Sequence, residues 1–394
     1  MLYPNIELMY KDELFLFTNY TQIKMSHHPI EKNDPILQRY IKKDYAVLVL
    51  SQDLSKYKKV CKYLRKKNIK EVIFVIDDVF RLNYKNYCSF LETDNIERDI
   101  QNVDFLEIQI IKNIINEADI SKYKIFHCEV IPRHIQKFLG VKIEYYDRFL
   151  AKWLDSRYWN REHETIKNNN PSYKVSTMSN RWDYHRTLIS AFFYDNKDFS
   201  YTMCEKPDID KMLKQTTLDL NKINLHVNYD YKQKLAEFLK QPCKSLDNEY
   251  IYQDNGEMFY TQEKQESLDP FIHTKNSYVH LINETRFASP MQYISEKTFK
   301  PMFCKRPFVM LGPPGNLSIL KKWGFKTFDK WWDESYDLET DHVTRLIAVK
   351  NIIETILKTD KNILDQMLYD MQDVIQHNDH HWQTFTTEFY NKLD

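Results

Sequence analysis

A Ser-Glu-Lys triplet at residues 295–297 carries side chains suited to nucleotide chemistry. Ser295 is a favoured N-cap residue, so the pattern predicts a helix that begins at Glu296. A carboxylate there can accept two hydrogen bonds from a ribose diol, and the ammonium of Lys297 can meet a phosphate as a point charge. The triplet therefore predicts a ligand site at the start of a short helix.

Two predicted strands flank this triplet. Tyr278–Ile282 alternates and is rich in β-formers, and polar residues follow it at Asn283, Glu284 and Arg286. Polar groups at the C-terminal end of such a strand face the crevice where open α/β sheets bind ligands. Pro307–Leu311 is typical of a buried parallel strand, and the Gly-Pro-Pro-Gly turn that starts at Gly312 leads into another helix. Free amides at that helix start are predicted to face a diphosphate.

This stretch resembles the donor-binding half of fucosyltransferase-like glycosyltransferases with the GT-B fold. The resemblance rests on Glu296-Lys297, on Asn283-Glu284 before it, and on the Pro-Phe-Val strand that ends in Gly-Pro after it. The whole of residues 295–328 is also similar to a segment of viral and bacterial glycosyltransferases. It implies an α/β protein with two Rossmann-like domains that face a cleft and C-terminal helices that cross back to the first domain. It also implies a nucleotide-sugar donor with no cofactor or metal, and contacts from Glu296 and Lys297 to ribose and phosphates.

A second turn carries further candidate donor-binding residues. Tyr173–Met178 is predicted as a strand, and a polar turn then leads into a helix through Phe193. This arrangement places basic side chains near a sheet edge and a helix N-terminus, which suits a diphosphate leaving group. The alternative for the two arginines is surface ion pairing. The candidates are Asn180, Arg181, His185 and Arg186.

The N-terminal half predicts a Rossmann-like domain, because short strands alternate with helices. Predicted strands are Leu14–Thr18, Tyr45–Ser51, Glu71–Asp77 and Lys124–Val130, with helices near 36–43, 55–68 and 105–118 and crossovers on both faces of a parallel sheet. Asp77 and Asp78 close one strand, where a general base for a hydroxyl acceptor would lie. A similar strand-then-Asp arrangement occurs in phage β-glucosyltransferases that modify hydroxymethylcytosine in DNA. A turn or helix cap is the structural alternative, and Glu129 is a second candidate base.

The helix around residues 55–70 combines an apolar face with a basic remainder. Val60, Cys61 and Leu64 have the spacing of a core face. Its basic residues are Lys56, Lys58, Lys59, Lys62, Arg65, Lys66, Lys67 and Lys70. They form either a solvated helix face or a surface that binds duplex DNA through its phosphates.

Composition sets the remaining bounds. Lys plus Arg equals Asp plus Glu at 56 each, so net charge does not identify a polyanionic partner. The six cysteines have no metal-binding spacing and indicate reduced thiols in the cytoplasm, the host cytoplasm if the source is viral. No signal peptide or membrane span is expected. The polar stretch at 148–171 predicts domains 1–160, joined by a C-terminal helix at about 378–394, and 161–377.

Other patterns allow both a functional and a structural interpretation. Asp208 and Asp210 have metal-pair spacing but are better explained as helix caps, and His377, His380 and His381 could ligate zinc from one helix face. Trp331 and Trp332 could stack a sugar, with Asp333 or Glu334 on its hydroxyls, or pack against the domain edge.

The predicted function is transfer of a hexose or pentose from a nucleotide-sugar to a hydroxyl acceptor. A hydroxymethylated base in viral DNA is weakly favoured as the acceptor, and a glycan is the alternative. A nucleotide-sugar-binding or nucleic-acid-binding protein without catalysis is the competing class, because no general base is defined by the sequence.

Overall fold

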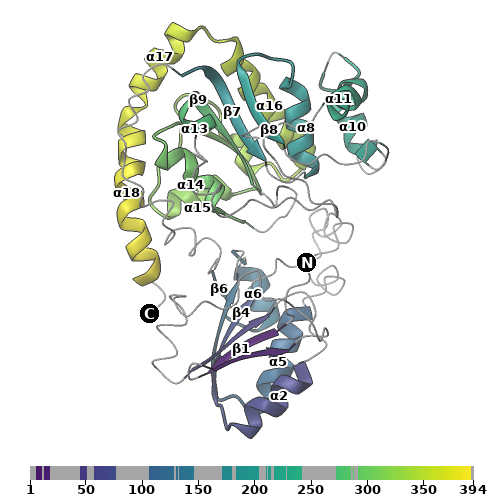
Figure 1. The fold of residues 1–394 in the computed structure, drawn as a ribbon, viewed down its shortest axis with the longest axis vertical. Coiled ribbons are helices and arrows are strands. Elements are labelled where there is room, and N and C mark those ends of the chain that lie inside the picture. The colour runs from purple at the N-terminus through teal and green to yellow at the C-terminus, as the bar shows by residue number, and fades with distance from the viewer. Residues whose placement is uncertain are drawn as a thin grey trace. The chain divides into compact units, whose positions relative to one another are not determined.

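The protein is an α/β structure that divides into two compact units, Met1–Ser156 with Phe389–Asp394 and Arg157–Glu388 (Figure 1). The α/β class predicted from the sequence is confirmed. No helix in the described ranges is long and apolar enough to cross a membrane. The computed structural model describes residues 6–10, 13–17, 45–50, 57–76, 106–127, 130–131, 133–145, 171–179, 183–203, 210, 212–213, 217–227, 229–241, 272–284, 287 and 292–391.

The first unit contains a sheet with strand order β2-β1-β3-β4-β5-β6. Its strands are β1 (Ile6–Tyr10), β2 (Glu13–Phe17), β3 (Ala46–Leu50), β4 (Glu71–Ile76), β5 (Lys122–His127) and β6 (Glu144–Tyr145). β3 to β6 are parallel, as predicted, whereas β1 is antiparallel to both β2 and β3. The prediction of an entirely parallel sheet is therefore wrong at this edge. Only two residues separate β1 from β2, too few for a crossover.

Three helices connect the parallel strands of the first unit. They are α2 (Tyr57–Lys66), α5 (Leu106–Ala118) and α6 (Arg133–Leu139), and the strands that they join succeed one another in one direction. Right-handed crossovers in one direction place these helices on the same face of the sheet, so the described part of the unit does not show the predicted coverage of both faces. The helix predicted at 36–43 lies outside the described residues.

The second unit contains a parallel sheet with strand order β10-β9-β7-β8. Its strands are β7 (Tyr173–Ser179), β8 (Phe199–Met203), β9 (Ser277–Asn283) and β10 (Phe308–Leu311). The chain runs from β7 outward to β8 and then returns to the other side of β7 for β9 and β10. The direction of winding therefore reverses between β7 and β9, and such a reversal is where open α/β sheets bind ligands.

Helices pack around this second sheet. They are α8 (Tyr184–Phe193), α10 (Thr217–Asn224), α11 (Tyr231–Lys240), α13 (Ile272–Lys275), α14 (Glu296–Phe303), α15 (Asn316–Lys322), the 3-10 helix η1 (Ser335–Leu338), α16 (His342–Lys358), α17 (Lys361–Asp370) and α18 (Gln372–Asn391). The C-terminal helices predicted from the sequence are α16, α17 and α18. Thr359, in an extended conformation, is the C-cap of α16, and Met371 is the C-cap of α17. The aromatic rings of Trp382 and Phe385 attach α18 to Phe299 and Phe325.

Candidate functional site

The carboxyl edge of the second sheet brings together most of the predicted donor-binding residues that the structure describes. β7 ends at Ser179 and β9 ends at Asn283, on the two sides of the winding reversal. The helices α8, α14 and α15 all begin at the same edge, because each follows a parallel strand. Their N-termini are the natural positions for an anionic group of a ligand. Which of them is free to bind one depends on how each is capped.

The start of α14 is occupied by side chains of the protein. Ser295 caps the helix as predicted, and its Oγ accepts from the amide of Lys297 at 3.3 Å. The carboxylate of Glu284 accepts from Ser295 N at 3.0 Å, from Ser295 Oγ at 2.6 Å and from Thr298 Oγ1 at 2.6 Å. Glu284 is fully buried. The structure therefore assigns Glu284 to the support of α14, in place of the ligand contact predicted from the sequence.

Glu296 and Lys297 form an ion pair on the outer side of this helix start. Glu296 Oε1 lies 2.8 Å from Lys297 Nζ, and their side chains are 17% and 26% exposed. Burial alone would raise the pKa of Glu296, but the ammonium groups of Lys297 and Lys300 lower it to about 2. The pair is thus charged and partly accessible, as the predicted contacts to ribose and phosphate require.

We expect this ion pair to make stability depend on pH. The pKa of Glu296 is about 2, against an ordinary value of 4.5. A lowered pKa contributes stability above the unfolded value, and that stability is lost as pH falls from about 4.5 toward 2. Urea unfolding between pH 6 and pH 3 should show a loss of roughly 2 kcal/mol that the Glu296→Gln variant lacks. If the free energy of unfolding falls equally with pH in the wild type and in Glu296→Gln, the charged Glu296–Lys297 pair is contradicted.

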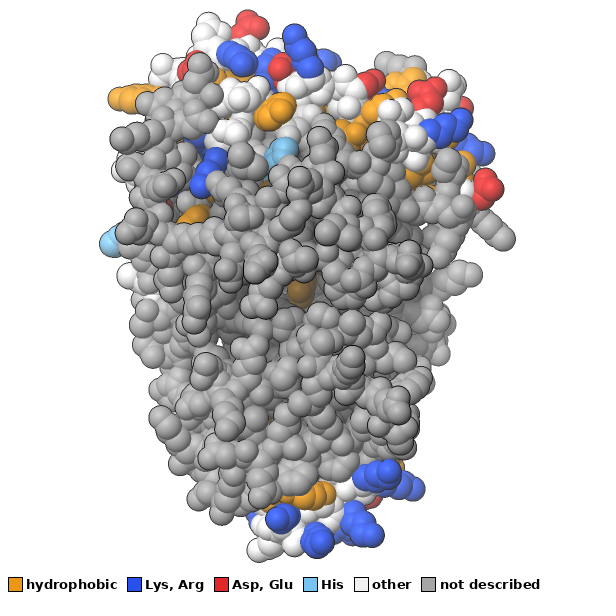
Figure 2. Space-filling view, in the orientation of Figure 1, with side chains coloured by type: hydrophobic (Ala, Val, Ile, Leu, Met, Phe, Trp, Pro, Cys, Tyr) orange, Lys and Arg blue, Asp and Glu red, His pale blue; other side chains and the backbone are white. Residues whose placement is uncertain are grey.

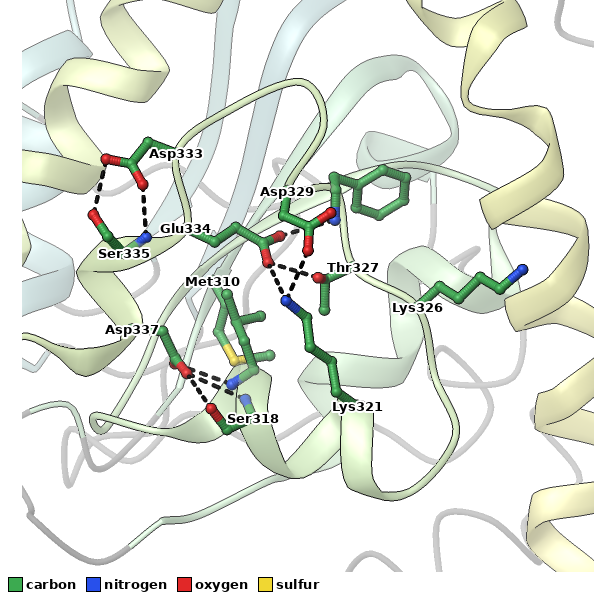
Figure 3. Close-up of polar contacts among 12 residues, drawn as sticks. Met310, Ser318, Lys321, Lys326, Thr327, Asp329, Asp333, Glu334, Ser335 and Asp337 are labelled. Carbon is green, nitrogen blue, oxygen red and sulfur yellow. Dashed lines mark hydrogen bonds and ion pairs between the residues drawn. The ribbon is translucent and has the colours of Figure 1, made fainter.

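The start of α15 is also occupied, which corrects the prediction for the loop at Gly312. The buried carboxylate of Asp337 accepts from Leu317 N at 3.0 Å and from Ser318 N at 3.2 Å (Figure 3). The carbonyl of Asp337 accepts from Gly315 N at 2.6 Å. The amides expected to face a diphosphate are therefore bound to Asp337. Gly312 itself lies against Glu284 and Asn316, where a Cβ atom would meet Asn316 Nδ2 at 2.7 Å. The tight packing shows why the chain has glycine here.

The acidic and aromatic loop after α15 is stabilised by its own side chains. Glu334 accepts from Thr327 Oγ1 at 2.6 Å and from Phe328 N at 2.8 Å, and Lys321 Nζ lies 3.3 Å from the same carboxylate (Figure 3). Asp333 accepts from the amide and hydroxyl of Ser335.

The tryptophans of this loop pack inward. Trp332 is 7% exposed, and its ring centroid lies 5.5 Å from that of Phe328. Trp331 is half-buried and lies 6.1 Å from the same ring. The packing alternative predicted for this loop therefore describes Trp332, and only Trp331 keeps a partly accessible face.

The start of α8 differs from the other two. Asp183 occupies the N-cap position in an extended conformation, but its side chain makes no capping hydrogen bond. Its carboxylate lies 3.1 Å from Arg186 Nη1, and Arg186 Nη2 donates to Asn283 O at 3.3 Å. The ion-pair alternative for Arg186 is thus observed, although the guanidinium lies beside the switch point.

His185 supports the same edge from within. Its Nε2 lies 2.8 Å from Glu284 O, and its ring stacks on Phe287 with centroids 4.9 Å apart. Burial lowers the pKa of His185 well below its usual value, and Arg186 lowers it further, so the ring is neutral. His185 therefore positions the strand end and carries no charge to a phosphate.

Arg345 is a residue that sequence reasoning missed. It is 1% exposed on α16, and its guanidinium donates to the carbonyls of Gly312, Phe287 and Glu339 while it lies 4.5 Å above the Phe287 ring. It thus joins the segments that follow β9 and β10 and the one that precedes α16. Nothing in the local pattern of α16 distinguishes this arginine from a surface residue.

The histidines of α18 hold a turn. His377 Nε2 lies 2.9 Å from Gly324 O, and His381 Nε2 lies 2.7 Å from Trp323 O, just beyond the C-terminus of α15. Within the described ranges, no cluster of His, Cys, Asp or Glu could hold a metal ion. The metal alternative for these histidines is therefore not supported.

Several predicted residues lie outside the described part of the chain. They are Asp77, Asp78, Glu129, Asn180, Arg181 and Asp208. Their roles as base or donor-binding residues stay predictions.

Comparisons with known proteins give little beyond this geometry. No protein-family model matches the chain, and no curated protein matches it. Among solved structures, the chain is similar to a mutant of T4 phage BGT in complex with UDP-glucose, at 10% sequence identity and a TM-score of 0.36. The similarity covers 87% of this chain and 79% of that chain.

Proposed function

We propose that the protein is a GT-B glycosyltransferase that binds a nucleotide-sugar at the carboxyl edge of its second sheet. The observation that carries the proposal is the capping of the three helices at this edge. Carboxylates of Glu284 and Asp337 occupy the starts of α14 and α15, whereas at the start of α8, beside the switch point, the Asp183 side chain makes no capping hydrogen bond. We therefore place the anionic group of the ligand at the start of α8, on the same sheet edge as the Glu296–Lys297 pair.

Each proposed contact follows from the chemistry of these groups. The first amides of α8 and the dipole of the helix stabilise the negative charge that develops on a departing diphosphate. Lys297 adds a cation at the neighbouring helix start, and Glu296 accepts hydrogen bonds from ribose hydroxyls. Arg181 adds a second cation in the turn before α8, and Asp77 or Asp78 of the first unit serves as the general base. No step in this scheme requires a metal.

A binding screen tests the proposal. UDP, GDP and ADP should each be compared with their nucleosides and with inorganic pyrophosphate by thermal shift and calorimetry, since a ligand of the native state raises its stability. We expect one nucleoside diphosphate to bind tighter than its nucleoside. Glu296→Ala should weaken it by about 1 to 3 kcal/mol, the range for losing a hydrogen bond to a charged group. Absence of binding by every nucleotide in the wild-type protein would overturn the proposal.

The acceptor that we propose is a hydroxymethylated base in duplex DNA, because α2 presents a basic face. Val60, Cys61 and Leu64 of α2 are buried within the first unit. Because these residues form the buried face of the helix, its other side chains point outward. The exposed basic residues are Lys58, Lys59, Lys62, Arg65, Lys66 and Lys67. Figure 2 shows blue side chains gathered where Figure 1 labels α2. A glycan acceptor, or binding without catalysis, would leave this face without a partner.

Charge reversal of α2 tests the DNA acceptor. Replacing Lys58, Lys62, Arg65 and Lys66 with Glu should abolish DNA binding, because phosphate neutralisation accounts for most non-specific affinity. Hydrolysis of the nucleotide-sugar should persist, since the donor residues belong to the other unit. The measurement is a mobility-shift titration at several salt concentrations.

The matched control reverses exposed lysines of the second unit, namely Lys322, Lys326, Lys330 and Lys361. This control should bind DNA as the wild type does. Wild-type protein without salt-dependent DNA binding would favour the glycan acceptor.

A further inference from the structure

Two buried side chains at the switch point have hydrogen-bonding capacity that the described part of the chain does not use. Ser179 and Asn283 are each 2% exposed. Neither Ser179 Oγ nor Asn283 Oδ1 has a hydrogen-bond partner in the portion of the chain described. Buried polar atoms are nearly always bonded, and these two lie where an open α/β sheet binds its ligand. They therefore indicate groups that a ligand completes.

The side-chain amide of Asn283 has a defined orientation. Thr177 Oγ1 donates its proton to Leu281 O at 2.9 Å, so its oxygen can only accept from a further partner. Asn283 Nδ2 donates to that oxygen at 2.7 Å. The reversed amide would set two acceptors against each other, which excludes it. Asn283 Oδ1 is thus held as a hydrogen-bond acceptor.

Ser179 and Asn283 end neighbouring strands on the same face of the sheet. Thr177 pairs with Leu281 in the parallel register, and Ser179 and Asn283 each lie two residues further along their own strand. Alternate residues of a strand share a face, so both side chains lie on the face that carries Thr177 Oγ1. The amide of Ser179 is already bound to Thr202 Oγ1 at 3.1 Å, which leaves its hydroxyl as the group available to a ligand.

We propose that Ser179 and Asn283 together bind one hydroxyl group of a sugar ring, an inference that rests on the proposed function. A hydroxyl donates its proton to Asn283 Oδ1 and accepts the proton of Ser179 Oγ. An ionised phosphate oxygen has no proton to donate to Oδ1, so the pair selects the neutral part of the ligand. The diphosphate then belongs at the start of α8, and the hydroxyl belongs to the ribose or to the transferred sugar.

The test compares two identical chemical changes. Ser190 of α8 is also fully buried, and its Oγ likewise has no partner among the described residues. Ser179→Ala and Ser190→Ala each remove a buried, unbonded hydroxyl, which should not lower the midpoint of thermal unfolding. Calorimetry uses whichever of UDP, GDP and ADP binds tightest, with and without glucose attached. We expect Ser179→Ala to weaken binding roughly three- to tenfold and Ser190→Ala to leave it unchanged.

The outcomes separate the possible partners. If Ser179→Ala loses equal affinity for the free nucleotide and for its glucose conjugate, the bound hydroxyl belongs to ribose. If it loses affinity for the conjugate alone, the hydroxyl belongs to the transferred sugar. If ribose is the partner, the matching deoxynucleotide should bind wild type and Ser179→Ala equally. Wild-type binding that Ser179→Ala does not change overturns the inference and leaves the proposed function standing. No binding by the wild type overturns both.

Discussion

Arg345→Met is expected to lower the free energy of unfolding by about 3 to 5 kcal/mol, a large part of the stability of an ordinary domain. The guanidinium is buried and donates to the carbonyls of Gly312, Phe287 and Glu339. Methionine fills similar volume but leaves these carbonyls without their donor, and each buried unsatisfied group costs roughly 1 to 3 kcal/mol. Burial lowers the pKa of Arg345 only to about 10, so the charge persists at neutral pH.

The measurement is urea unfolding of the full chain at neutral pH. Lys358→Met provides the matched control, because Lys358 lies on the same helix with its side chain 75% exposed. Surface changes of this kind usually alter stability by less than about 0.5 kcal/mol. The free energy of unfolding of Arg345→Lys should lie between those of Arg345→Met and Lys358→Met. An ammonium group keeps the charge but cannot reach all the carbonyls that the planar guanidinium bonds. Equal midpoints for Arg345→Met and Lys358→Met would refute the role of Arg345.

Glu284→Leu is expected to lower the free energy of unfolding by about 2 to 4 kcal/mol and to release the start of α14. Its carboxylate accepts from the amide and hydroxyl of Ser295 and from the hydroxyl of Thr298. Leucine leaves these buried donors without an acceptor. Because the next residues of the helix are Glu296 and Lys297, we also expect weaker nucleotide binding.

Urea unfolding and amide hydrogen exchange at Lys297 and Thr298 measure the two effects separately. The control is Glu237→Leu on the exposed side of α11, which removes a carboxylate that hydrogen-bonds only at the surface. Glu284→Gln should be milder, because an amide still offers one acceptor oxygen. Unaltered exchange at the start of α14 in Glu284→Leu would show that Ser295 caps the helix without help.

Local patterns in the sequence predicted the elements of the second sheet well. The predicted strand Tyr278–Ile282 is β9, Pro307–Leu311 contains β10, and Ser295 caps α14. Each of these depends on neighbouring residues, as alternation and N-cap chemistry do. The helix through Phe193 was predicted for the same reason.

The sequence could not predict which site residues bond to the protein itself and which remain available to a ligand, because their partners are distant in the chain. Asp337 reaches back 20 residues to the amide of Leu317, and Asn283 bonds to Thr177 across 106 residues. Local spacing marked the Gly312 turn as a phosphate site, yet a carboxylate from a later loop occupies it. Ser179 drew no assignment as a ligand-binding residue, and Asn283 was predicted only to face the ligand crevice, because their unused atoms become apparent only when the strands are paired.

The pairing of β7 with β9 also has a consequence for synthesis on the ribosome. Thr177 and Leu281 are 104 residues apart, so at about 5 to 20 residues per second β7 waits roughly 5 to 20 seconds for its partner. During that interval one edge of β7 has unpaired N–H and C=O groups, which can template pairing with another chain. Nascent chains stalled near residue 250 should therefore aggregate more readily than chains stalled well beyond β10, as sedimentation of the stalled complexes would measure. The edge of β7 that β9 later covers is thus a site of misassembly while the protein is made.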